Sequence, residues 1–145
     1  MSNRATICLG ANTPDAARQL DGAYALLEKS GTVLVSTPRY PTDPEFAGDA
    51  APYLNRIVIV ETELSFEAFS VITKEYQTRV RALANAKPLV AVDIDVVVWN
   101  GTIKRPSDAS AAYFKKGLEL LQEGAQNTCD AAAAMSDISI GETIK

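Results

Sequence analysis

The stretch Leu89-Val-Ala-Val-Asp-Ile-Asp-Val-Val-Val-Trp99 is the most strand-like run of this chain, and it carries two carboxylates in its middle. Side chains of a strand alternate between the two faces of a sheet, so we expect Asp93 and Asp95 on one face. The alternation also assigns Leu89, Ala91, Val97 and Trp99 to that face, and Val90, Val92, Ile94, Val96 and Val98 to a wholly apolar opposite face. The stretch therefore predicts two carboxylates side by side on one face of a sheet, flanked on that face by apolar residues.

These two carboxylates stand close enough to interact. Their Cα atoms should lie roughly 6.6–7 Å apart, from a rise of about 3.3 Å per residue. Ionised carboxylates at this spacing repel each other and lose hydration when partly covered, and a cation beside them offsets both effects. Mg²⁺ takes oxygen ligands, typically one or two carboxylates together with substrate phosphates. The alternatives are a pair on a solvated sheet face, or carboxylates that each bond to an arginine or a backbone N–H, and the stretch alone leaves these open.

The composition is that of an ordinary globular protein, and we expect residues 1–145 to form a single domain. Of the 145 residues, 47% are hydrophobic and 22% are charged, and the formal net charge is −4. Because there is no long basic run, nucleic acid is not expected as a partner. No export signal is found and no apolar run approaches ~18 residues, so we expect a cytoplasmic protein without a membrane role. The chain has no histidine, which excludes imidazole bases and the usual zinc sites.

Apolar periodicity and turn residues divide the chain into alternating elements. Strands are expected at 5–9, 32–37, 53–62, 89–99 and 102–104, and helices from Thr13 to Gly31, from Ser65 to Leu83 and from Pro106 to Gly124. The order β-α-β-β-α-β-β-α predicts an α+β protein with a ferredoxin-like βαββαβ core, an added hairpin strand and a third helix. Helices should pack on a mainly antiparallel sheet.

Three segments complete this outline. Asn100-Gly101 is the strongest short hairpin signal in the chain. Residues 38–52 hold four prolines, which predicts a long loop of the kind that binds ligands or closes over them. Residues 125–145 are expected to form a tail of uncertain structure.

Five short fragments, in order and with matching spacing, give the chain its resemblance to a known family. They are Leu9-Gly10-Ala11-Asn12, Tyr40-x-Thr42-x-Pro44, Tyr53-Leu54-Asn55, Arg79-Val80-Arg81 and Asp93-Ile94-Asp95. Over roughly residues 4–121 the chain resembles the 6-hydroxymethyl-7,8-dihydropterin pyrophosphokinases, folate-pathway enzymes that move a diphosphate from ATP to a pterin alcohol. The resemblance implies ATP and a pterin alcohol as substrates and Mg²⁺ as the cofactor. It leaves the oligomeric state open.

The resemblance implies a metal and nucleotide side of the site. Asp93 and Asp95 correspond to the pair that holds two Mg²⁺ ions on the ATP phosphates. Arg79 and Arg81 resemble arginines that face the phosphates, and we assign Arg79 a catalytic role, although residues two apart on a helix do not share a face. The nucleotide-binding set is Arg79, Arg81, Lys87 and Lys116.

The resemblance also implies a pterin pocket. Its residues are Thr42, Pro44, Tyr53, Asn55 and Leu118. Tyr53 can stack on a flat pterin ring, and the Asn55 amide offers a donor and an acceptor to the pterin edge. The alternative interpretation is a strand-start tyrosine packed on the core, an asparagine that caps a turn, and Thr42 as an ordinary turn residue.

Several positions depart from the family pattern. Residues 82–91 lack the family's Trp and Arg, Ser107 stands in place of a histidine after the hairpin, and Lys74 replaces an acid in the helix before the arginines. Lys116-Gly117-Leu118 stands for Arg-Gly-Phe, which keeps the charge but loses the bidentate guanidinium and one aromatic wall. We therefore expect slower turnover than in a typical member.

Three hypotheses are compatible with the sequence. The first is Mg-dependent transfer of diphosphate from ATP to the hydroxymethyl group of 6-hydroxymethyl-7,8-dihydropterin. The second is a non-catalytic homologue that binds a pterin, a nucleotide or a protein partner. The third is a ferredoxin-like module that only mimics the pattern.

Overall fold

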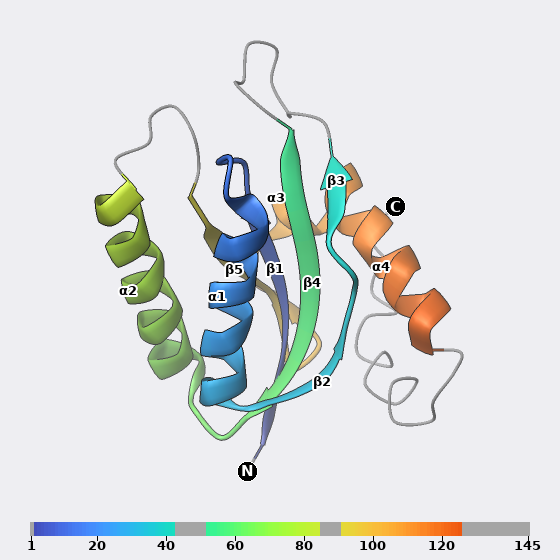
Figure 1. Ribbon diagram of the computed structural model, residues 1–145. Coiled ribbons are helices and arrows are strands. Elements are labelled where there is room, and N and C mark those ends of the chain that lie inside the picture. Colours follow the sequence, from blue (N-terminus) through green and yellow to red (C-terminus); the bar gives the residue numbers. More distant parts are fainter. Residues whose placement is uncertain (1, 43–51, 85–90, 126–145) are drawn as a thin grey trace.

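The strand and helix periodicities of the sequence produce an antiparallel sheet with helices on both of its faces (Figure 1). The structure, a computed structural model, describes residues 2–42, 52–84 and 91–125. Its strands are β1 (Asn3–Ala11), β2 (Thr32–Ser36), β3 (Tyr40–Thr42), β4 (Tyr53–Thr62), β5 (Asp93–Trp99) and β6 (Thr102–Ile103). Its helices are α1 (Ala16–Ser30), α2 (Phe66–Ala84), α3 (Pro106–Ala109) and α4 (Ala112–Ala125).

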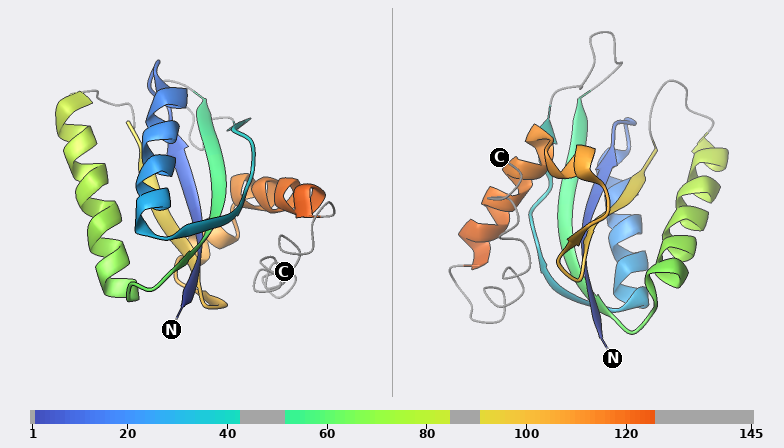
Figure 2. Two further views of the ribbon diagram at one scale, coloured as in Figure 1. Left: turned by 60° about the horizontal axis from the view of Figure 1, so that its bottom comes forward. Right: turned by 180° about the vertical axis from the view of Figure 1, so that it is seen from behind.

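The strands lie in the order β2-β4-β1-β5-β6, with β3 paired to β4, and every pairing is antiparallel. Helices α1 and α2 cover one face of the sheet, and α3 and α4 cover the other (Figure 2). The predicted α+β class with a mainly antiparallel sheet is confirmed. Among the described residues, no helix is both long enough and apolar enough to span a bilayer.

Each face of the sheet has its own hydrophobic core. Beneath α1 and α2, the largest fully buried side chains are Ile7, Leu9, Leu20, Leu27, Phe69 and Ile94. Beneath α3 and α4, the core contains Cys8, Ile57, Ile59, Val98, Phe114, Leu118 and Leu121. Burial of a large apolar side chain contributes about 1.5–3 kcal/mol, so both cores stabilise the sheet that lies between them.

A β-bulge changes the face assignment in the second half of β5. Thr6 of β1 lies opposite Val98 while Ile7 lies opposite Val96, so Val97 is an extra residue in β5. After this insertion Val98 packs in the core beneath α3 and α4, and Trp99 packs beneath α2. The expected faces of Val98 and Trp99 were therefore wrong, whereas Asp93 and Asp95 precede the bulge and share a face as expected.

Strand boundaries differ from expectation at two places. Within the predicted loop 38–52, Tyr40–Thr42 form the short strand β3, because Tyr40 is buried and its hydroxyl donates to the Tyr113 carbonyl oxygen at 2.9 Å. β1 extends beyond the predicted 5–9 because both of its edges are paired over most of its length. β5 begins at Asp93, and residues 89–90 of the predicted strand lie outside the described residues.

Helix boundaries were predicted in part. Ser65 caps α2 as expected, since its Oγ accepts the Ala68 N–H at 3.1 Å. α1 begins at Ala16 and not at Thr13, because the Thr13 hydroxyl donates to Asp15 instead of capping the helix. The predicted helix from Pro106 to Gly124 is divided into α3 and α4, and the Ala111 N–H bonds back to Asp108 at this break. The Asn100-Gly101 hairpin is confirmed by positive φ angles of 49° and 79°.

Candidate active site

Strand pairing brings four residues from distant parts of the sequence into one row across the sheet. Tyr40 lies opposite Asn55, Asn55 lies opposite Gly10, and Gly10 lies opposite Asp93. Directly opposed residues point to the same face. Neighbouring strands are about 4.8 Å apart, so the Cα atoms of Asn55 and Asp93 lie roughly 10 Å apart. The predicted pterin and metal residues therefore occupy one end of one sheet face.

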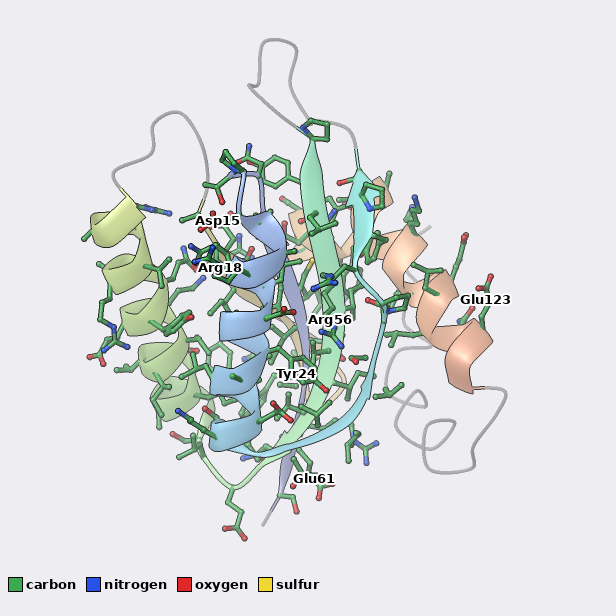
Figure 3. The ribbon with its side chains drawn as sticks, in the orientation of Figure 1. Asp15, Arg18, Tyr24, Arg56, Glu61 and Glu123 are labelled. Atoms are coloured by element: carbon green, nitrogen blue, oxygen red, sulfur yellow. The ribbon has the colours of Figure 1, made fainter. Side chains whose placement is uncertain are left out.

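The next residue along β4 shows which face this is. Arg56 points toward α1, where its guanidinium carbon lies 4.1 Å from the centre of the Tyr24 ring (Figure 3). Because neighbouring side chains in a strand alternate, Asn55 points to the opposite face, the one that α3 and α4 cover. The helix α1 therefore does not shield the candidate site.

Asp95 already has two cationic partners. Its Oδ1 lies 3.1 Å from Lys74 Nζ and 3.6 Å from Arg105 Nε, and its side chain is 18% exposed. A largely covered carboxylate needs such compensation, because burial of an ionised group without a partner is costly. One alternative left open by the sequence, a carboxylate paired within the protein, thus describes Asp95 as the structure shows it.

Asp93 is held more loosely. Its Oδ1 accepts a hydrogen bond from Gln77 Nε2 at 3.2 Å and lies 3.8 Å from an Arg81 nitrogen, and its side chain is 37% exposed. Burial raises the pKa of Asp93 above its ordinary value and the nearby charge of Asp95 raises it further, while Lys74, Arg81 and Arg105 act in the opposite direction. Asp93 therefore has fewer and more distant cationic partners than Asp95.

Helix α2 covers the free edge of β5 beside this pair. Lys74 Nζ donates to the Ile94 carbonyl oxygen at 2.6 Å, and Gln77 Oε1 accepts the Ile94 N–H at 2.9 Å. In an antiparallel pair, the backbone N–H and C=O groups of every second residue point away from the partner strand. The backbone groups of Ile94 point away from β1 in this way, and α2 supplies their hydrogen-bond partners. The two side chains of α2 thus fix the edge on which Asp93 and Asp95 stand.

The residues present fit a magnesium ion in chemistry. Two neighbouring carboxylates supply the hard oxygen donors that Mg²⁺ takes, and substrate phosphates commonly complete its coordination. Within the described parts of the chain, no group of three or more acidic, cysteine or histidine side chains converges to hold a metal. A magnesium ion held by these two carboxylates would therefore take its remaining ligands from water or from substrate phosphates.

The predicted pterin residues on the sheet form a connected group. Asn55 is 4% exposed, and its Nδ2 donates to Thr42 Oγ1 at 2.7 Å. Opposite it, a Cβ on Gly10 would lie 3.3 Å from Asn55 Oδ1 and 3.8 Å from Tyr53 Cδ1. Gly10 thus leaves the room that these two side chains occupy. Pro44 lies outside the described residues.

The remaining predicted residues are placed differently from one another. Leu118 is buried in the core beneath α4, and the exposed Lys116 donates to the Pro41 carbonyl oxygen at 3.3 Å. Arg79 is exposed and lies 5.8 Å from the Tyr76 ring, whereas Arg81 is the arginine of α2 that approaches Asp93. Lys87 lies outside the described residues.

A cluster that we did not predict from the sequence borders Asp95. Arg105 Nε and the Tyr113 hydroxyl both donate to the Asp108 carboxylate. Burial raises the pKa of the Tyr113 hydroxyl, and the bond to Asp108 raises it further. In the sequence, only the position of Arg105 directly after the hairpin indicates that it could reach the site. For Gln77, the only indication is its position between Lys74 and Arg81.

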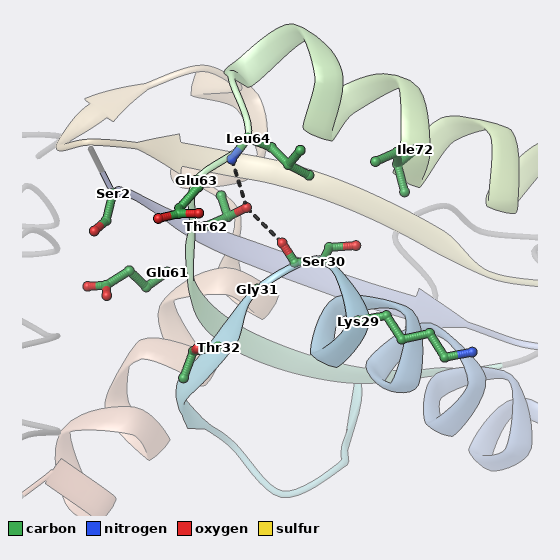
Figure 4. A pocket seen from close by; sticks show the side chains of 10 residues that line it. All are labelled: Ser2, Lys29, Ser30, Gly31, Thr32, Glu61, Thr62, Glu63, Leu64 and Ile72. Atoms are coloured by element: carbon green, nitrogen blue, oxygen red, sulfur yellow. Dashed lines mark hydrogen bonds between the residues drawn. The ribbon is translucent and has the colours of Figure 1, made fainter.

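A separate hollow lies at the other end of the sheet, around the end of α1 and the start of α2 (Figure 4). Its lining contains Lys29, Gly31, Glu61, Thr62 and Leu64. The Thr62 hydroxyl donates to the Ser30 carbonyl oxygen at 2.7 Å and accepts the Leu64 N–H at 3.2 Å. None of the predicted site residues lines this hollow.

Comparisons with known proteins point to one family. The model of the 7,8-dihydro-6-hydroxymethylpterin-pyrophosphokinase (HPPK) family matches residues 6–123. Among solved structures, the chain is similar to the Plasmodium falciparum HPPK-DHPS wild type with pteroate, at 14% sequence identity and a TM-score of 0.51. The match covers 70% of this chain and 29% of that one, and at this identity it shows the fold alone. No curated protein matches the chain.

Proposed function

The chain belongs to the 7,8-dihydro-6-hydroxymethylpterin-pyrophosphokinase family, and on that premise we propose that it transfers a diphosphate from ATP to the hydroxymethyl group of 6-hydroxymethyl-7,8-dihydropterin. Enzymes of this family use ATP and Mg²⁺ and act in folate biosynthesis. The acceptor alcohol, the two magnesium ions and the cytoplasmic location are parts of the proposal. The chain spans 29% of the similar solved structure, and nothing is carried over from the rest of that protein.

One observation supports the proposal most strongly. The row from Asn55 through Gly10 to Asp93 joins the family's pterin-side and metal-side residues across three adjacent strands. A separation of roughly 10 Å between the ends of the row suits an acceptor at Asn55 and a triphosphate at Asp93 and Asp95. Residues that merely mimicked the family pattern would have no reason to meet at one end of one face.

In the proposed reaction the chain positions two substrates. Tyr53 stacks on the pterin ring, and the Asn55 amide, released from Thr42, pairs with the pterin edge. The hydroxymethyl oxygen attacks the β-phosphorus, the bond from that phosphorus to the bridging oxygen of AMP breaks, and the alcohol proton passes to water. Among the described cations, we assign Arg79, Arg81 and Lys116 to the nucleotide side. We keep Leu118 and Pro44 at the edge of the pterin pocket.

Asp93 and Asp95 would hold the two magnesium ions. When bound, the ions neutralise the triphosphate and lower the barrier to the transfer. The contribution of the chain is to keep both carboxylates on one rigid strand whose edge is fixed by α2. We assign Arg79 a supporting role on the phosphates, although its guanidinium lies on the Tyr76 side of the helix.

The decisive measurement is AMP release from ATP in the presence of the pterin alcohol and Mg²⁺. We expect Asp95→Asn to lower the rate at least about a hundredfold, since stabilisation of phosphoryl charge is worth several kcal/mol. Asp21→Asn, an equivalent change on the exposed side of α1, should leave the rate unaltered. A decrease of less than about threefold for Asp95→Asn would remove Asp95 from the mechanism.

A second candidate function has a specific observation in its favour. Asp95 is paired with Lys74 and Arg105, and the Asn55 amide is bonded to Thr42, so both groups are satisfied without ligands. This arrangement suits a homologue that binds a pterin, a nucleotide or a protein partner without catalysis. Calorimetric titration with 6-hydroxymethylpterin and a non-hydrolysable ATP analogue separates the two. Pterin binding without Mg²⁺-dependent nucleotide binding would favour the second candidate.

A further inference from the structure

Three oxygen atoms surround the ammonium group of Lys74. Nζ lies 2.6 Å from the Ile94 carbonyl oxygen, 3.1 Å from Asp95 Oδ1 and 3.2 Å from Gln77 Oε1. An ammonium has three N–H donors, so each donor of Lys74 is matched by one acceptor. A backbone carbonyl, a carboxylate and an amide carbonyl are also ligands that hard cations take in proteins.

We propose that Lys74 is a built-in cation that occupies this group of oxygens and competes with a divalent ion for Asp95. The proposal rests on the function proposed above, because it concerns the same carboxylate. In the free protein Lys74 supplies the positive charge that Asp95 requires. A divalent ion that binds Asp95 must displace the ammonium or share the carboxylate with it. Either event weakens the binding of the ion.

The surroundings identify Lys74, and not Arg105, as the competing group. Arg105 Nε donates to Asp108, and it lies 3.6 Å from Asp95, beyond a normal hydrogen bond. Lys74 has Asp95 as its acidic partner, and its side chain is 48% exposed at the end of a flexible stem. A flexible, half-exposed ammonium can leave its site in response to another cation. The Arg105 side chain is equally exposed, at 47%, but its guanidinium is bonded to a second acid, Asp108.

Gln77 explains why loss of Lys74 would leave a usable site. Its Oε1 also accepts the Ile94 N–H at 2.9 Å, and its Nε2 donates to Asp93 Oδ1 at 3.2 Å. These bonds hold the Gln77 oxygen in place independently of Lys74. Removal of the ammonium therefore leaves three positioned oxygens with a net negative charge, which is a better site for a divalent ion.

The test measures metal binding directly. Mn²⁺ is titrated into the full chain, with free Mn²⁺ followed by electron paramagnetic resonance, and Mg²⁺ is titrated by calorimetry. We expect Lys74→Gln to bind Mn²⁺ about tenfold more tightly than wild type, since a unit charge within a few ångströms repels the ion even in high dielectric. Lys74→Met provides a second neutral variant, and thermal unfolding shows that each variant is folded.

Two control variants separate local charge from general charge. Lys74→Arg keeps the positive charge and should bind Mn²⁺ as wild type does. Lys29→Gln removes an equal charge at the opposite end of the sheet and should also bind as wild type does. Tighter binding in Lys29→Gln to the same extent as in Lys74→Gln would overturn the proposal, because the effect would then come from net charge.

Asp93→Asn and Asp95→Asn distinguish failure of this inference from failure of the proposed function. If these variants lose Mn²⁺ binding but Lys74→Gln and Lys74→Met bind no more tightly than wild type, the role of Lys74 is wrong and the metal site stands. If wild type, Asp93→Asn and Asp95→Asn all bind alike, the metal site of the proposed function is wrong, and the role of Lys74 falls with it.

Discussion

At the scale of single residues, Asp93 and Asp95 have different surroundings although they stand on one face of one strand. Asp95 has Lys74 and Arg105 beside it, whereas Asp93 has a neutral amide donor and one more distant arginine. The two carboxylates are therefore not interchangeable in the free protein. The negative charge of Asp93 is less well compensated by neighbouring cations than that of Asp95. A bound cation should therefore stabilise the ionised form of Asp93 more than that of Asp95.

This difference predicts the effect of pH on Asp93→Asn. A raised pKa means that the native state holds the proton of Asp93 more tightly than the unfolded chain does, so the ionised form lowers stability above the folded pKa. That loss is fully present near pH 7 and vanishes as the pH falls below the ordinary pKa of 3.8. Asp93→Asn should therefore raise the free energy of unfolding near pH 7 by less than about 1 kcal/mol, since solvent screens this side chain.

Urea unfolding of wild type and Asp93→Asn at about pH 7 and about pH 3 checks the prediction. The increase in the free energy of unfolding of Asp93→Asn over wild type should be present at the higher pH and absent at the lower one. Asp21→Asn, which removes an exposed carboxylate paired with Arg39, should not raise the free energy of unfolding at either pH. A gain of equal size at both pH values would show that the carboxylate's charge is not its source.

At the scale of elements, the site depends on how α2 lies along the edge of β5. The Gln77 side chain accepts the Ile94 N–H and donates to the Asp93 carboxylate. It thus provides a hydrogen bond to the β5 backbone that a neighbouring strand would otherwise make. An edge strand without such cover presents its backbone to solvent or to another chain. Gln77 thus links the fold of α2 to the position of the carboxylates.

Removal of this cover should be visible at one amide. In Gln77→Ala the Ile94 N–H loses its partner, and a hydrogen bond of this kind contributes about 1 kcal/mol. We expect the Ile94 amide to exchange with deuterium roughly five- to tenfold faster by NMR, with a small decrease in thermal stability. Thr78→Ala, at the exposed neighbouring position of α2, should leave that amide unchanged. Unaltered exchange in Gln77→Ala would show that another group protects the edge.

The elements also show how far the sequence could predict the structure. Alternation along 89–99 correctly placed Asp93 and Asp95 together, because they precede the bulge. It failed at Val98 and Trp99, because the inserted residue Val97 arises from pairing with β1, which the local pattern does not contain. Lys74, Gln77 and Arg105 reach the site from other elements, so single-strand periodicity could not reveal them. For the family's residues, strand register and not spacing in sequence brings Asn55 next to Gly10.

At the scale of the whole molecule, the site lies on the face that α4 covers, so the packing of α4 on the sheet sets its shape. At Gly117, α4 comes very close to the side chains of the sheet. A Cβ there would meet the Ile57 side chain and the Tyr40 hydroxyl more closely than real Cβ atoms approach other atoms. The same Tyr40 hydroxyl donates to the Tyr113 carbonyl oxygen, which fastens β3 to the start of α4. Gly117 therefore lets the second core close while β3 keeps its place beside Asn55.

Gly117→Ala should force α4 away from the sheet. Overpacking of a closed core costs about 1–3 kcal/mol, and here the added methyl group meets a buried isoleucine and a bonded tyrosine. We expect a lower urea midpoint and weaker pterin binding, since movement of Tyr40 disturbs the strand that positions Thr42. Gly124→Ala is the matched control, because its Cβ would meet no atom within 4 Å and alanine favours a helix by up to about 1 kcal/mol. Equal or greater stability of Gly117→Ala relative to wild type would show that α4 is not held to the sheet at this position.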